Sequence, residues 1–116
     1  IFSRNQTKAQ VKKSKIQEET TSLALDQVKI NLESTIQRAF TDAKAALKAF
    51  EAAQLSLESQ ELAFNNSKER FALGALNSFD LEQSRIRLLN ALSSSINAKY
   101  DFIFKTKVLD YYLGKR

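Results

Sequence analysis

The chain has 116 residues and a formal net charge of +5, with 43% hydrophobic and 27% charged residues, which is apolar enough for one modest domain. It contains no Cys, His, Met or Trp, which excludes thiol chemistry, imidazole catalysis and metal sites built on His or Cys. We therefore expect no cofactor and no metal. No apolar run approaches the roughly 18 residues of a membrane-spanning helix, and residues 1–15 lack the apolar segment of a signal peptide.

The basic charge lies at the two ends of the chain. Residues 1–20 and residues 99–116 each carry a net charge of +3, whereas the residues between them carry −1. Basic ends can attract nucleic acid or anionic headgroups, but here the basic residues are not interleaved with aromatic residues on one face. This distribution is more typical of solubilising charge near helix ends, and no nucleic-acid partner is expected.

Residues 6–73 are predicted to form one long helix, because they contain no Gly or Pro and their apolar residues recur at three- and four-residue steps. Three sets of residues follow a heptad spacing. The first contains Ile36, Phe40, Ala43, Leu47, Phe50, Leu57, Phe64 and Phe71; the second Ala39, Ala46 and Ala53; and the third Ile16, Leu23 and Ile30. A helix with two apolar stripes is expected to have neighbours on two sides, as in a wall of helices.

The stretch RFALGALNSFD, residues 70–80, carries signals that end one helix and begin the next. Gly74 can adopt the left-handed conformation that closes a helix. Asn77 or Ser78 can cap the following helix, and Asp80 would lie in its first turn, where the helix dipole favours a carboxylate. We expect a tight turn over residues 74–78.

Residues 79–112 are predicted to form the second helix, with Gly114 just past its end. Its apolar residues form two sets: Ile86, Leu89, Ile96, Tyr100 and Ile103, and Leu81, Leu88, Leu92 and Phe102. The predicted fold is thus all-α, a long antiparallel helical hairpin of coiled-coil type. A hairpin centred near Leu76 leaves the segment before about Arg38 without a partner from this chain. Alternatively, the first helix breaks near residues 18–22 and folds back as a three-helix bundle.

The acidic residues do not suggest catalysis. The closest carboxylate pairs are Asp80 with Glu82 and Glu58 with Glu61, and no His or apolar pocket is evident that would shift their pKa values. Neighbouring acids on a helix are far more often a solvated face. The chain is not expected to be an enzyme.

Three segments carry a resemblance to a known family: IFSRNQTKAQVKKSKIQ at residues 1–17, ERFALGALNSFDLEQSR at residues 69–85, and AKYDFIFKTKVLDYYLG at residues 98–114. Together they resemble the second structural repeat of the TolC family of outer-membrane efflux proteins, in a form typical of Bacteroidetes-like sequences. The likeness covers essentially residues 1–116.

This resemblance implies that the chain is the periplasmic hairpin of a homotrimeric channel, which helps to form an α-helical barrel. Such channels act in efflux or type I secretion in the outer membrane of Gram-negative bacteria. They are passive conduits that work with a periplasmic adaptor and an inner-membrane pump. The membrane-spanning barrel strands would lie outside this segment, and residues 1–3 would be the last trace of one of them.

The resemblance also implies roles for individual residues at the turn. Gly74 matches the family's tip glycine, where an adaptor hairpin approaches closely, and Asp80 matches an acidic position that can face the entrance of the lumen. Arg70, Asn77 and Ser78 would be adaptor contacts by their position. The departures are Leu76 and Gln83, which stand where some relatives have charged residues, so no polar network that locks a closed tunnel is expected.

Two other interpretations remain open from the sequence. One is the α-hairpin of the periplasmic adaptor itself, whose tips resemble an Arg, Leu, Ser spacing. That spacing fails here, because Gly74 follows Arg70 by four positions and Ile96 stands where the Ser after Arg85 should fall. The other is a stand-alone three-helix or coiled-coil interaction module, of which the three-helix form requires a break near Thr20.

Overall fold

The computed structural model describes residues 2–114 and contains two helices, with no strand among these residues. Helix α1 comprises Phe2–Ala72, 71 residues, and helix α2 comprises Ser78–Tyr112, 35 residues. The chain divides into two units, residues 1–37 and residues 38–116. The all-α prediction is confirmed.

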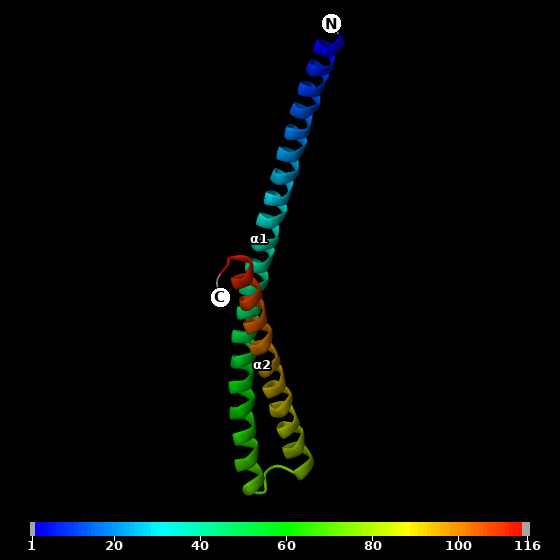
Figure 1. The fold of residues 1–116 in the computed structure, drawn as a ribbon. Helices are drawn as coiled ribbons and strands as arrows, with labels where there is room; N and C mark the ends of the chain where they lie inside the picture. Colours follow the sequence, from blue (N-terminus) through cyan, green and yellow to red (C-terminus); the bar gives the residue numbers. More distant parts are fainter. Residues whose placement is uncertain (1, 115–116) are drawn as a thin grey trace. The chain divides into compact units, whose positions relative to one another are not determined.

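The second unit is an antiparallel hairpin. From residue 38 onward, α1 runs beside α2, and the two helices are joined by a short turn (Figure 1). Their register is defined by two contacts: the rings of Phe50 and Phe102 stack with centroids 6.5 Å apart, and the Ser67 hydroxyl lies 3.2 Å from that of Ser84. The predicted helical hairpin is therefore confirmed.

The surface between the two helices, which we call the seam, follows a regular alternation of three- and four-residue steps, as in coiled coils. Its buried and half-buried residues on α1 are Ala39, Ala43, Ala46, Phe50, Ala53, Leu57, Gln60, Phe64 and Ser67. Those on α2 are Leu81, Ser84, Leu88, Ala91, Ser95, Ala98, Phe102, Lys105 and Leu109. The two helices therefore contact each other over nearly the whole length of α2.

The seam corrects how the sequence grouped the apolar residues of α1. The sequence pattern assigns two columns of residues to separate stripes: Ala39, Ala46 and Ala53 to one, and Ala43, Phe50, Leu57 and Phe64 to the other. In the structure the two columns form one seam, because a heptad interface uses two adjacent columns. Phe40 and Leu47 belong to the next column and are 52% and 38% exposed. Phe71 follows the seam but is also exposed, since it lies at the turn.

The most buried positions of the seam are small. Only Ala39, Ala43, Ala46, Ser84 and Ser95 are buried, and no large side chain is fully buried among the described residues. Small side chains at a contact shorten the distance between two helix axes. Such a seam buries little apolar area, so most larger apolar side chains remain at the surface.

A second apolar stripe runs along the face of α2 that points away from the seam. We call Ile86, Leu89, Ile96, Tyr100 and Ile103 the outer stripe, and their exposed fractions lie between 41% and 65%. Ile86 and Leu88 are two residues apart and thus about 200° apart around the helix, so the outer stripe and the seam occupy opposite faces. The second apolar set predicted for α2 also contained Leu92, but this residue is exposed and does not belong to the seam.

The first unit is a single helical segment, and α1 continues without interruption through residues 18–22. The hydroxyls of Thr20 and Thr21 donate hydrogen bonds of 2.8 Å to the carbonyls of Ile16 and Gln17. The Thr residues are thus accommodated inside the helix. The break that a three-helix module requires is absent, so that interpretation is wrong.

The start of α1 corrects a second expectation. Ile1 lies outside the described residues, but Phe2 and Ser3 are helical rather than the end of a strand. A strand needs a neighbouring strand for its backbone hydrogen bonds, and no strand occurs among residues 2–114. The Ser3 carbonyl instead accepts a 2.7 Å hydrogen bond from the Thr7 hydroxyl.

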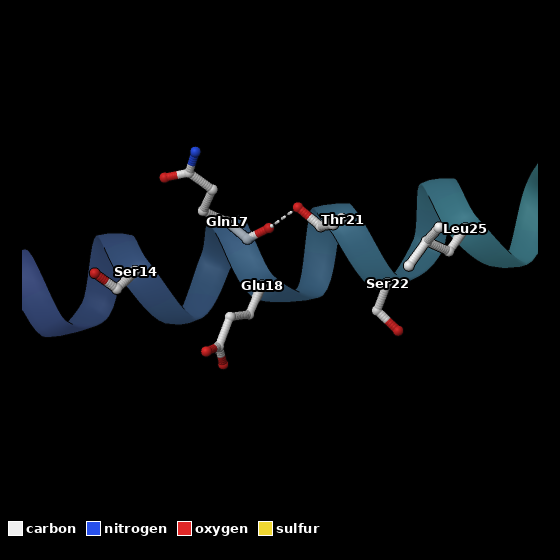
Figure 2. Close-up of a pocket in the computed structure, with 6 residues that line it drawn as sticks. All are labelled: Ser14, Gln17, Glu18, Thr21, Ser22 and Leu25. Carbon is white, nitrogen blue, oxygen red and sulfur yellow. Dashed lines mark hydrogen bonds between the residues drawn. The ribbon is translucent and has the colours of Figure 1, made fainter.

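The first unit carries apolar residues on two faces, and they are exposed. The predicted column Ile16, Leu23, Ile30 is 57–69% exposed, and Leu25 is 65% exposed. Leu25 lies about 200° around the helix from Leu23. Figure 2 shows Leu25 with Ser14, Gln17, Glu18, Thr21 and Ser22 along one stretch of α1.

Candidate functional site at the hairpin tip

The end of α1 is a Schellman motif centred on Gly74. Its φ angle is +77°, in the left-handed region. The Gly74 N–H donates to the Phe71 carbonyl over 3.0 Å, and the Ala75 N–H donates to the Arg70 carbonyl over 2.8 Å. These two hydrogen bonds satisfy carbonyl groups that the helix end would otherwise leave unpaired.

Gly74 is required here by its backbone conformation rather than by crowding. A Cβ atom at this position would meet no other atom within 4 Å. The positive φ angle is therefore the whole intramolecular reason for a glycine. The open space beside it is compatible with the close approach of a partner, which stays a prediction.

The start of α2 is capped by Asn77. Its side-chain oxygen accepts a 2.7 Å hydrogen bond from the Asp80 N–H, and its carbonyl accepts one from the Leu81 N–H over 3.1 Å. Of the two candidate caps, the structure uses Asn77, and Ser78 is the first helical residue. Asp80 lies in the first turn, where its charge is favourable to the helix dipole.

Beside the turn, α1 and α2 enclose a groove of about 620 Å³, which we call the tip groove. Its walls combine charged, polar and apolar side chains, and the apolar residues Leu76 and Phe79 lie close to the turn. The lining residues are Gln60, Ala63, Ser67 and Arg70 from α1, Leu76 from the turn, and Phe79, Asp80, Gln83, Ser84 and Arg87 from α2.

The tip groove brings together only some of the residues predicted from the sequence. Arg70 and Asp80 both line it, whereas Gly74, Asn77 and Ser78 do not. Sequence reasoning missed Phe79 and Arg87. A signal for Arg87 existed, because it stands seven residues after Asp80 and so occupies the same side of the helix.

The charged side chains at the tip differ in their partners. Arg85, which does not line the tip groove, donates two hydrogen bonds of 3.1 Å from Nε to the Glu82 carboxylate. The hydrogen bond from Arg85 holds the pKa of Glu82 below its usual range. By contrast, the side chains of Arg70, Asp80 and Arg87 form no ion pair with any residue that the structure describes.

This arrangement is suited to binding rather than to catalysis. The tip groove has one carboxylate, Asp80, and amide, hydroxyl and guanidinium groups that donate hydrogen bonds. At the far end of the hairpin, a smaller groove of about 330 Å³ is apolar apart from Lys44. Its other lining residues are Phe40, Ala43, Leu47, Phe102 and Leu109.

Comparison with known families identifies the class of protein. The family model described as outer membrane efflux protein matches residues 1–115, and the chain belongs to that family. Comparison with curated proteins and with solved structures gives no significant match. Neither helix, within the residues that the structure describes, contains an apolar segment long enough to cross a membrane.

Membership of this family has consequences for the sequence-based predictions. The suspected TolC-like origin is confirmed. The family forms the walls of outer-membrane efflux channels and consists of channel proteins, which supports the prediction of a non-enzyme and argues against an adaptor hairpin. The roles of Arg70, Gly74, Asn77, Ser78 and Asp80 stay predictions.

Proposed function

We propose that the chain forms part of the periplasmic wall of a trimeric outer-membrane efflux or secretion channel, a passive conduit. The observation that carries this proposal is the outer stripe of α2. Its residues Ile86, Leu89 and Ile96 are 42–47% exposed on the face opposite the seam. An apolar face that the hairpin itself does not cover requires another helix beside it.

The exposed apolar residues of residues 1–37 support the same proposal. Leu23 and Leu25 lie on opposite faces of that segment and are 69% and 65% exposed. A helix with apolar residues on two opposite faces fits a wall in which each helix has a neighbour on both sides. In the full assembly, those neighbours would come from the other repeat and from neighbouring subunits.

The tip is proposed to bind a periplasmic adaptor, which connects the channel to an inner-membrane pump. The Schellman motif at Gly74 and the Asn77 cap supply hydrogen bonds at both ends of the turn. Leu73, beside Gly74, is 83% exposed and available to a partner. Asp80 is proposed to contribute negative charge to the entrance of the lumen, where three subunits would present it together.

The proposed wall can be tested in cells that make the complete channel. Ile96→Asp places a charge in the outer stripe and is expected to abolish both trimer formation on native gels and substrate export. Ser94→Asp is the matched control, because Ser94 is exposed on the same helix, outside the stripe. Normal trimers and normal export with Ile96→Asp would refute the proposed packing.

A further inference from the structure

The charges in the tip groove are not balanced by the chain itself. Two arginines and one aspartate line it, so it carries an excess of one positive charge. Arg85, the nearest other arginine of α2, is already hydrogen-bonded to Glu82. Arg87 faces no acidic side chain in the groove, because the lining residues of α1 at its level are Gln60 and Ala63.

The tip groove also has the size and the apolar contacts that a protein partner needs. Its volume of about 620 Å³ leaves room for side chains of a partner. Phe79 is 68% exposed beside Leu76 at the end of the groove near the turn. Exposed aromatic residues and arginines are the side chains that most often dominate binding between proteins.

We propose that the tip groove binds a helical segment of the periplasmic adaptor that presents an acidic side chain to Arg87, away from Asp80, with an apolar side chain on Phe79. This inference rests on the proposed function and specifies the chemistry of the partner. A carboxylate suits the site because a guanidinium binds it in a bidentate fashion. The remaining polar groups, on Gln60, Ser67 and Gln83, supply donors and acceptors to a helix surface.

A chemical cross-linking experiment in cells that make the complete channel tests the carboxylate directly. Arg87→Lys supplies an amine, which a water-soluble carbodiimide joins to a carboxylate in contact with it. Mass spectrometry then identifies the linked residue. We expect at least a tenfold higher yield of adaptor cross-linked through a glutamate or aspartate for Arg87→Lys than for Ser94→Lys. Ser94 is the matched control because it lies seven residues along the same side of α2, beyond the groove.

Charge reversal provides a second, independent measurement. Arg87→Glu is expected to lower the amount of adaptor recovered with the channel about tenfold, and Ser94→Glu to leave it unchanged. Because Arg87 is exposed and unpaired, the variant should still assemble, which the trimer band on a native gel verifies. An unchanged recovery with Arg87→Glu would overturn the proposal.

A photo-cross-linking residue in place of Leu73 separates this inference from the proposed function. Leu73 lies at the tip but does not line the groove, so it reports docking of any kind. Adaptor captured at Leu73, with no carboxylate captured by Arg87→Lys, would overturn the groove proposal alone. Capture of another channel subunit through the amine would also overturn it. No adaptor captured at either position would overturn the proposed docking as well.

Discussion

Replacing Ala46 by leucine tests whether the seam is built on small side chains. Ala46 is 4% exposed and faces α2 in the hairpin. Adding a larger side chain at a well-packed contact costs about 1–3 kcal/mol, because the side chain or the backbone must shift. The neighbouring Ala45 is exposed, so Ala45→Leu changes only the helix propensity, by a few tenths of a kcal/mol.

The two variants can be compared by thermal unfolding followed by circular dichroism. For a unit of this size, 1 kcal/mol corresponds to a shift of about 4–8 °C in the unfolding midpoint. Ala46→Leu should therefore lower the midpoint by at least about 4 °C, and Ala45→Leu should leave it within about 3 °C. Equal midpoints for the two variants, or a higher midpoint for Ala46→Leu, would refute the assignment of the alanine column to the seam.

Three further predictions follow from the turn, the register and the exposed ion pair. Gly74→Ala should lower the free energy of unfolding by about 1–2 kcal/mol, because alanine is strained in the left-handed conformation of residue 74, and Gly74→Asn should lower it by less. Urea unfolding that gives the same loss for both variants would show that the backbone conformation is not the cause. The double variant Ala53→Cys with Ala98→Cys should form a disulfide on mild oxidation, because the register places these two positions on facing turns. The disulfide is detectable as faster migration on a non-reducing gel, and failure to form it would contradict the register. The carboxyl group of Glu82 should titrate at lower pH than an ordinary glutamate in NMR, and Arg85→Gln should raise its pKa. Because the pKa is lowered in the folded state, any stabilisation by this pair is present above the unfolded-state pKa and is lost as the pH falls through the folded-state value; an unshifted pKa in the parent chain would show that the pair does not form in solution.

The tip shows how far local sequence signals reach. The roles of Gly74 and of an Asn or Ser cap followed from residue chemistry alone, because both act through hydrogen bonds between residues close in the chain. The choice of Asn77 over Ser78 was left open, since either side chain can cap a helix. The structure resolved it through the 2.7 Å hydrogen bond to the Asp80 N–H.

The tip groove was not predictable in the same way. Its walls come from residues such as Ser67 and Ser84, which are 17 positions apart and meet only when the helices pair in one register. Arg87 looked like any other surface arginine until α1 was placed beside it. The partner of an exposed side chain depends on the register, which a single helix does not specify.

The sequence by itself determined that the chain is helical, that the first helix ends at Gly74, and that each helix carries more apolar surface than one partner can cover. The tertiary structure decided which of these surfaces forms the seam. Both stripes of α2 have the same heptad period, so the periodicity did not distinguish them. In the structure, Ala91, Ser95 and Ala98 lie in the seam and face α1, whereas the bulkier Ile86, Leu89 and Ile96 are exposed on the outer stripe. The physical reason is that small side chains at these positions allow the two backbones to approach closely. The large seam residues Leu81, Leu88 and Phe102 stay half-buried between the helices, and the outer stripe is left exposed for other helices.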